Sequence, residues 1–417
     1  MNTFLKISLL SVAVSASAMS FAQNHISYGS QQSIDFKYLK GERRTGQIAY
    51  RAFEGMSYVV NPTDRKYQAI NIYIPDAYYS GGAVNGFKSA TAPVLFYVVA
   101  DDYREKEAAK AEGSKFLQQA LSHGYIVACP GVRGRALGSG KAPAVVADLK
   151  AAVRYLKYND DDMPGDATKI VACGAGAGGA MAAMLGASGL SSDYDAMLDA
   201  LGATRSDDDV FGVVALSPAT IPNHADEAAA WLTGNDSKGD FAKYINSLNL
   251  KGTDGSLLTL DTSDRGSFLV ALEREAGEAA KGHIGNFSLM EHSTTTVLGK
   301  KYDAPDRSSS LNDLFGTGNG GMHFTMPYAD DANMASPMTV RMMTPMTYIG
   351  NSDIEVAPHW LVRQSLADSY PPVLSFVLAV KLRNAGKAVA YSMAWGEQTL
   401  DNSESYGVFK WIDGISR

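Results

Sequence analysis

The chain has 417 residues, of which 46% are hydrophobic and 19% are charged, and its formal net charge is −7 at pH 7. This length and composition allow a substantial buried core, and they suit one large domain with an insertion, or two domains. The acidic balance, without any basic run, argues against a nucleic-acid-binding protein.

The N-terminal residues have the pattern of a secretory signal peptide. Lys6 supplies the positive charge, residues 7–18 form an apolar stretch, and residues 20–22 form a small-x-small cleavage site. A transmembrane anchor needs a longer apolar span of about 20 residues. We therefore predict that residues 1–22 are a signal peptide and that the mature chain is exported, periplasmic or secreted, without a membrane anchor.

Strand-like and helix-like segments alternate through the first half of the mature chain. Short alternating runs around residues 58–60 and 68–75 predict an antiparallel pair at a sheet edge. Further predicted strands are 92–101, 124–131, 169–173 and 210–218, and the predicted helices are 105–123 and 143–158. Because these strands are apolar on both faces, we expect an α/β fold in which helices flank a mostly parallel central sheet.

A long interval separates this region from the last core segments. Between residues 218 and 358 about 140 residues pass, too many for an ordinary connection. The interval contains helical pieces and Gly-rich turns. We predict a first core part at 23–218, an inserted, mainly helical cap or lid at 219–357, and a second core part at 358–417.

One glycine cluster fits two different sites. In "KIVACGAGAGGAMAAMLGAS", Gly174, Gly176 and Gly179 satisfy the dinucleotide fingerprint G-x-G-x-x-G, although strands precede the loop and no second strand ends in a suitably placed acid. Gly174 and Gly178 instead frame a nucleophile elbow, G-x-S-x-G, with Gly176 where the serine belongs. The surrounding strand and helix favour the elbow, and nucleotide binding stays a weaker hypothesis.

Segments spread over nearly all of the mature chain resemble the bacterial tannase and feruloyl-esterase-like branch of the α/β-hydrolases. They include "YQAINIYIPDAYYSGGAVNG", "GYIVACPGVRGR", "PGDATKIVACGAGAGGAMAAMLGASG", "APHWLVRQS" and "FKWIDGI". Active members of that branch carry G-T-S-A-G-G at the elbow, so the resemblance places Ala175 at the Thr and Gly176 at the nucleophilic Ser. It implies an α/β-hydrolase fold with a lid, in a family of serine carboxylester hydrolases.

The remaining triad positions depart from the family as well. The acid and then the histidine follow the nucleophile along this fold, yet no histidine follows His359. The resemblance places Thr399 where the family has its histidine, Asp368 at the acid, and Tyr370 at a second acid that helps hold phenolic hydroxyls. Without the hydroxyl and the imidazole, the acyl-enzyme route is closed.

Part of the site can survive this loss. Backbone N–H groups of Ala177 and of Asp101 or Asp102 are candidates for an oxyanion hole. Cys173 lies three residues before Gly176, where a buried hydrophobe is a more typical role than a nucleophile. A disulfide between Cys173 and Cys129 is not expected, because the strand at 92–101 lies between their two strands.

Other polar residues have a structural interpretation beside the functional one. Arg133 and Arg135 follow a strand end, where they either meet an acidic ligand or form structural salt bridges. We expect a structural role for His359. His292 and His323 fall in the predicted cap, where a ligand-facing role has no further support. The acidic runs at residues 160–162 and 207–209 are interpreted as solvated turns, and no group has metal-ligand spacing.

These observations lead to a degenerate, exported relative of tannases and feruloyl esterases without ordinary hydrolase activity. Its expected partner is a small aromatic or ester ligand in a cleft between core and cap, or another protein. We predict no cofactor and no metal. The alternative is an active carboxylester hydrolase that uses an unrecognised nucleophile.

Overall fold

The structure is a computed structural model that describes most of the chain after its N-terminal segment. The described residues are 30–37, 45–236, 238–261, 266–292, 306, 309–317, 320–368, 370–396, 399–400 and 407–417. The predicted signal peptide at 1–22 lies outside them and stays a prediction. Among the described residues, no helix combines the length and the apolar character needed to cross a membrane.

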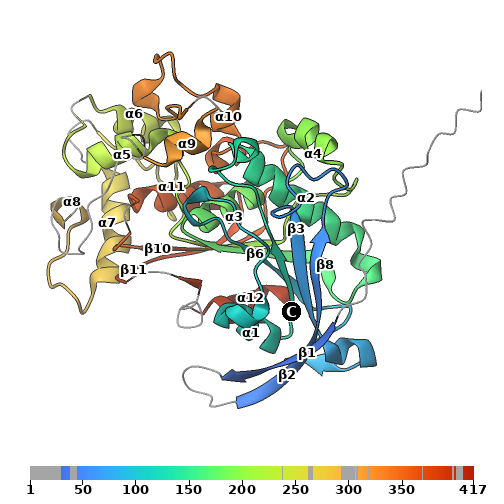
Figure 1. The fold of residues 1–417 in the computed structure, drawn as a ribbon. Coiled ribbons are helices and arrows are strands. Elements are labelled where there is room, and N and C mark those ends of the chain that lie inside the picture. The colour runs from blue at the N-terminus through green and yellow to red at the C-terminus, as the bar shows by residue number, and fades with distance from the viewer. Residues whose placement is uncertain are drawn as a thin grey trace, which may run out of the picture.

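A nine-stranded sheet forms the centre of the described part of the chain (Figure 1). Its order is β1-β2-β3-β7-β6-β8-β9-β10-β11. The strands are β1 (Ser30–Lys37), β2 (Thr45–Ser57), β3 (Ala69–Pro75), β6 (Pro93–Val98), β7 (Ile126–Pro130), β8 (Asp166–Ala175), β9 (Gly212–Leu216), β10 (His359–Ser365) and β11 (Ala388–Ala394). The pairs from β1 to β7 are antiparallel, and those from β7 to β11 are parallel. The mostly parallel sheet predicted from the sequence is confirmed. The run at 68–75 forms β3, but its antiparallel partner is β2, whereas the predicted partner at 58–60 lies in a bend after β2.

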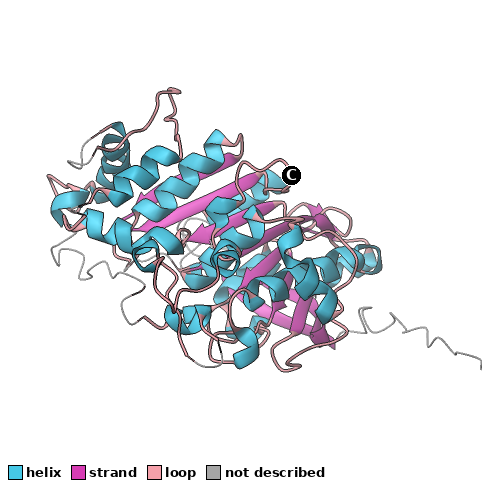
Figure 2. Cartoon of the chain, turned by 90° about the horizontal axis from the view of Figure 1, so that it is seen from above, coloured by secondary structure: helices cyan, strands magenta, loops and turns pink. Residues whose placement is uncertain are grey.

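Helices cover both faces of this sheet (Figures 1 and 2). The strand β9 shows the two faces, because Gly212 lies against Trp411 and Ile415, whereas Val213 lies against Gly186. One face carries α2 (Ala144–Tyr158), α3 (Ala177–Ala187) and α11 (Val373–Asn384), and the other carries α1 (Lys115–Ser122) and α12 (Val408–Ser416). This double cover explains why the central strands are apolar at successive positions. A short helix α4 (Asp195–Leu201) and a two-stranded ribbon of β4 (Ala83–Val84) and β5 (Phe87–Lys88) complete these parts.

The interval between β9 and β10 folds as short helices. Its described helices are α5 (Ala225–Leu232), α6 (Asp240–Ser247), α7 (Ser267–Ala280), α8 (Leu289–His292), α9 (Leu311–Phe315) and α10 (Pro337–Arg341). α7 lies against β11, and Phe268 of α7 packs edge-on against Phe376 of α11, with 5.6 Å between the ring centroids. This part of the insertion is therefore continuous with the core packing. The boundaries 219–357 and the function of the insertion as a lid stay predictions.

The helix predicted over residues 105–123 is wrong in its first half. α1 begins at Lys115, where the hydroxyl of Ser114 accepts a hydrogen bond from the Leu117 N–H at 3.3 Å. Upstream, Lys106 and Val132 exchange backbone hydrogen bonds of 3.0 and 2.8 Å. This pairing of Lys106 with a distant segment competes with a helix, and only a 3-10 turn at Ala111–Gly113 precedes α1.

The interpretation of residues 207–209 as a solvated turn is also wrong. Asp208 is fully buried and pairs with Lys150 at 2.7 Å and with Arg154 at 2.8 Å. Its neighbour Asp209 pairs with Lys157 at 2.5 Å. The acidic run anchors α2 to the segment that enters β9, because α2 supplies all three cations.

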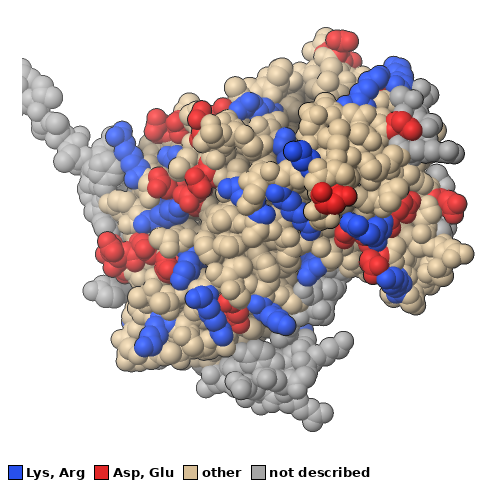
Figure 3. All heavy atoms as spheres, turned by 180° about the vertical axis from the view of Figure 1, so that it is seen from behind, with Lys and Arg blue, Asp and Glu red and all other residues tan. Residues whose placement is uncertain are grey.

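Charges of both signs are mixed over the surface of the described residues. In Figure 3, Lys and Arg side chains lie among Asp and Glu side chains over one face of the molecule. Several exposed charges form pairs, such as Lys106 with Asp101 at 2.9 Å and Lys66 with Glu107 at 3.0 Å. Such exposed pairs contribute little to stability, and the face in Figure 3 carries no continuous basic band.

Candidate functional site

The turn between β8 and α3 has the geometry of a nucleophile elbow. Gly176 lies between the last residue of β8 and the first residue of α3, with φ 56° and ψ −124°. Its N–H donates to the Leu216 carbonyl at 2.8 Å. A Cβ built on Gly176 meets no atom within 4 Å. The backbone therefore has the strained conformation that this turn imposes on its central residue, but no side chain stands at the apex.

The neighbouring glycines are required by close packing. A Cβ at Gly174 would lie 2.2 Å from the carbonyl oxygen of Gly178, and a Cβ at Gly178 would lie 2.5 Å from that of Val98. At Gly179 the corresponding distance to the Leu216 oxygen is 2.7 Å. Because all these contacts are to backbone, the strand and helix approach this closely only with glycine. The spacing that imitates a dinucleotide fingerprint thus has a packing explanation.

The other two candidate triad positions also follow parallel strands. Asp368 comes three residues after the end of β10, is partly buried, and accepts a hydrogen bond from the Tyr370 N–H at 3.2 Å. Thr399 follows β11 and is exposed. Because β8, β10 and β11 run parallel, the loops with Gly176, Asp368 and Thr399 leave the same edge of the sheet. Between Asp368 and Thr399, both described, the structure has no hydrogen bond.

The candidate oxyanion segment lies beside the start of α3. Asp101 and Asp102 belong to a 3-10 turn (Asp101–Tyr103) after β6, and this turn contacts α3, whose first residue is Ala177. Asp102 has a positive φ of 52°. Its carboxylate accepts a hydrogen bond from the Ser310 hydroxyl at 2.8 Å and pairs with the Arg135 guanidinium. Burial alone raises the pKa of Asp102, but these donors outweigh burial, so the pKa is lowered.

Both arginines near this edge form the salt bridges that the sequence left as one of two possibilities. Arg133 is buried and pairs with the fully buried Asp148 at 2.7 Å. Arg135 donates from Nε to the Asp102 carbonyl at 2.8 Å and pairs with Asp313 of α9 at 3.2 Å. Arg135 thereby joins the segment after β6 to the inserted helices, and carboxylates of the chain itself occupy both guanidinium groups.

Three histidines of the insertion contact acidic or aromatic groups. His224 hydrogen-bonds to Glu227 within the same turn. His323 Nδ1 lies 3.1 Å from the buried Asp306 carboxylate. The ring of His283 stacks on Trp395 with 4.8 Å between centroids. These contacts include no hydroxyl or thiol nucleophile.

The two remaining histidines named from the sequence differ in what the structure says about them. His359 is the first residue of β10, so it lies where the parallel strands begin, whereas the elbow lies where they end. Its ring centroid lies 4.6 Å from that of Phe211. Burial lowers its pKa. This position agrees with the expected structural role. The side chain of His292 lies outside the described part of the chain.

The two cysteines lie on strands that are separated by a third strand. Cys129 in β7 and Cys173 in β8 are free and fully buried, with β6 between their strands. Burial raises the pKa of both thiols. A thiol in this state is a poor nucleophile, so the geometry agrees with the expected hydrophobic role.

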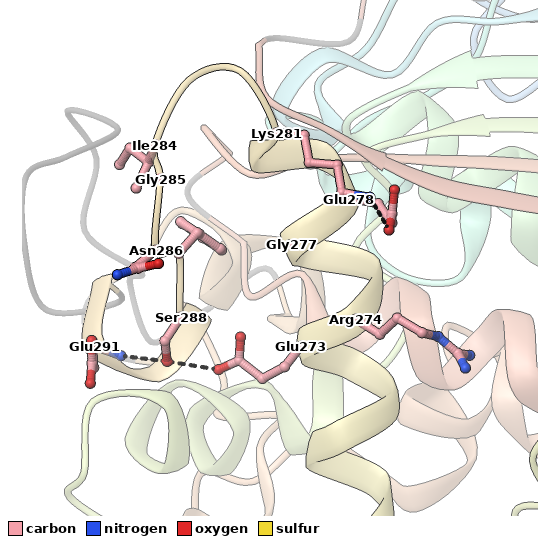
Figure 4. A pocket seen from close by; sticks show the side chains of 11 residues that line it. Glu273, Arg274, Gly277, Glu278, Lys281, Ile284, Gly285, Asn286, Ser288 and Glu291 are labelled. Carbon is pink, nitrogen blue, oxygen red and sulfur yellow. Dashed lines mark hydrogen bonds and ion pairs between the residues drawn. The ribbon is translucent and has the colours of Figure 1, made fainter.

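A surface groove of about 510 Å³ lies between α7 and the segment after it (Figure 4). Glu273 of α7 accepts hydrogen bonds from the Ser288 hydroxyl at 2.9 Å and from the Leu289 N–H at 2.8 Å, and Glu278 pairs with Lys281 at 2.5 Å. The residues that line the groove belong to none of the loops after β8, β10 and β11. The groove is therefore a separate surface feature whose charged walls hold the local fold together.

Arg363 in β10 was not singled out from the sequence. It is the one charged residue in the strand "HWLVRQS", and that interruption of an apolar run is the signal that points to it. In the structure it lies level with Ala175, at the edge of the sheet where the elbow stands.

The sheet order, the helices on both faces and the sharp turn after β8 define an α/β-hydrolase. A family model named BD-FAE matches residues 85–244. The tannin acyl hydrolase from Lactobacillus plantarum has a similar structure, with 28% identity over 94% of this chain and 98% of that chain, and a TM-score of 0.83. The Fusobacterium nucleatum tannase is 32% identical over 94% of this chain and 99% of that chain, with a TM-score of 0.82. The chain belongs to the tannase family of the α/β-hydrolases.

Two further tannin acyl hydrolase structures are complexes. One contains 3,4-dihydroxybenzoate and the other contains ethyl gallate, and each is 28% identical to this chain with a TM-score of 0.84. Both matches cover 94% of this chain and 98% of the other. The curated protein sequences compared with the chain gave no match.

Proposed function

We propose that this chain is an exported, catalytically degenerate tannase-like protein that binds a small aromatic acid or ester without hydrolysing it at an enzymatic rate. The observation that carries the proposal is Gly176 at the apex of an otherwise well-formed elbow. Residues 1–22 support export. A second possibility for what the inactive chain binds is another protein.

The chemistry of the missing groups supports this proposal. Glycine offers no oxygen to attack an ester carbonyl, so no acyl-enzyme forms, and Thr399 has no basic nitrogen to activate water in its place. The N–H of Ala177 and the turn after β6 remain as oxyanion donors. Such donors and binding alone leave a rate far below that of an intact triad.

The alternative of an active hydrolase needs a nucleophile beside a base. Cys173 is buried with a raised pKa, and His224 and His323 bond to carboxylates. None of these groups supplies the pair of a nucleophile and a neighbouring imidazole that ester hydrolysis by covalent catalysis requires. We therefore favour binding over hydrolysis.

The proposed class of ligand is based on structures of related proteins. The complexes of related tannin acyl hydrolases contain 3,4-dihydroxybenzoate and ethyl gallate, and we propose that the cleft between the core and the inserted segment of this chain accepts compounds of that class.

The test measures binding and turnover on the same purified mature chain. Isothermal titration calorimetry should detect ethyl gallate or 3,4-dihydroxybenzoate, while released gallate should stay at the background rate. Turnover of about 1 s⁻¹ or faster, the range of ordinary enzymes, would refute the proposal. The variant with Gly176→Ser and Thr399→His is the matched control, since ester hydrolysis gained there shows that the cleft still orients an ester.

A further inference from the structure

Arg363 brings a positive charge to the edge of the sheet that carries the elbow. In the strand register, Arg363 of β10 pairs with Leu216 of β9, which in turn pairs with Ala175 of β8. Arg363 is therefore level with the residue that precedes Gly176, two strand spacings of about 4.8 Å away. Its side chain bonds to Ser392 of β11, on the side of β10 that faces away from β8.

Three other cations in or near the core have carboxylate partners. Lys150 and Arg154 pair with Asp208, and Arg133 pairs with Asp148, at 2.7 to 2.8 Å. These pairs follow the general rule that a buried charge requires an opposite charge close by.

Arg363 departs from this rule. It is partly buried, and among the described residues it forms no ion pair. One guanidinium NH₂ group donates a hydrogen bond to the Ser392 hydroxyl of the adjacent strand β11, while Nε is buried without any partner. Burial also lowers the pKa of Arg363, because the charged guanidinium has lost part of its hydration. The fold thus keeps a guanidinium that is desolvated and not neutralised.

The unsatisfied group has a defined chemical preference. A guanidinium presents N–H donors in a planar fork that matches the two oxygens of a carboxylate. The Ser392 hydroxyl accepts a hydrogen bond from Arg363, so its own proton is available to donate to the same anion. The pair therefore suits a planar oxyanion better than a neutral ester.

We propose that Arg363 and Ser392 form a subsite for the carboxylate of an aromatic acid, so that the free acid is preferred over its ester. This proposal rests on the proposed function, because it specifies which member of that ligand class the cleft retains. An anion at this position neutralises the guanidinium. A protein without a nucleophile has no need to release the acid as a product, and it is free to hold it as a ligand.

The experiment compares gallic acid with its own ethyl ester, ethyl gallate, by titration calorimetry on the mature chain and its variants. Arg363→Gln should weaken binding of the acid by about 10-fold or more, as for the loss of a charged hydrogen bond, and leave ester binding within about 2-fold. Arg363→Lys should restore part of the affinity for the acid. Arg51→Gln removes the same charge from β2, where Arg51 pairs with Asp76 of the turn after β3, and it should change the binding of neither ligand.

The outcomes separate this inference from the proposed function. If the parent chain binds ethyl gallate but not the acid, or if Arg363→Gln weakens both equally, the subsite is overturned while the proposed function stands. If neither compound binds, the proposed function fails and the subsite with it. Displacement of the acid by inorganic phosphate at similar concentration would overturn the aromatic acid as the occupant.

The melting temperature Tm distinguishes a binding role of Arg363 from a purely structural one. Removing a buried charge that has no partner should leave the Tm of Arg363→Gln equal to or above that of the parent. A Tm several degrees lower would identify Arg363 as a structural group and overturn the subsite.

Discussion

Replacing Gly176 by serine tests whether the fold itself holds the backbone at the elbow. Gly176 has φ 56° and ψ −124°, and a Cβ there meets nothing within 4 Å. The side chain therefore has room, and the cost is backbone strain of about 1–3 kcal/mol for a residue with a Cβ. Because serine has less conformational entropy than glycine in the unfolded chain, the substitution also stabilises the folded state by about 0.4–1 kcal/mol. We expect Gly176→Ser to lower the free energy of unfolding by about 1–2 kcal/mol.

Two further glycines serve as matched controls. In Gly174→Ala the new Cβ would lie 2.2 Å from the Gly178 oxygen, and because that neighbour is backbone we expect a loss of about 3 kcal/mol. Gly277 lies within α7 with nothing within 4 Å, so Gly277→Ala should gain about 0.5–1 kcal/mol. Urea unfolding followed by circular dichroism measures all three variants. A loss at Gly176→Ser as large as that of Gly174→Ala would show that the space at the apex is not open.

Two other predictions concern titratable groups of the core. Burial raises the pKa of Asp413, but hydrogen bonds from His123 and other donors outweigh burial and lower it. Such a carboxylate stabilises the fold above its unfolded pKa of about 4 and loses this contribution as the pH falls through the folded value. Asp413→Asn should therefore lower Tm at pH 7, with a difference from the parent that vanishes in acid; a constant difference contradicts the argument. Because burial raises the pKa of Cys129 and Cys173, a thiol reagent at pH 8 should label neither in the native chain and both after unfolding, and labelling of the native chain would contradict their burial.

Much of the fold could be predicted because its signal is local. The helix over residues 143–158 was placed within one residue of α2, since a proline marks its start and its apolar residues repeat at helical spacing. Gly174 and Gly178 indicated the tight strand–helix turn. The resemblance to tannases then indicated the fold of almost the whole mature chain, and the structural matches agree with it.

The failures have a common physical cause in contacts between distant segments. The stretch before Lys115 has helical periodicity, but Lys106 pairs with Val132 and no α-helix forms there. Asp208 belongs to an acidic run that looks solvated, yet the cations of α2 allow it to be buried. In both cases the partner lies outside any sequence window, and its contribution outweighs the local preference.

The sequence by itself determined that residue 176 carries no hydroxyl and that no histidine follows His359, because residue identity is a matter of covalent structure. Only the tertiary structure decided how the charges are used. It gave Arg133 a buried carboxylate and left Arg363 with none, although both residues follow or interrupt apolar strands. Electrostatic pairing depends on which groups folding brings within a few ångströms, and burial makes each such pairing, or its absence, energetically significant.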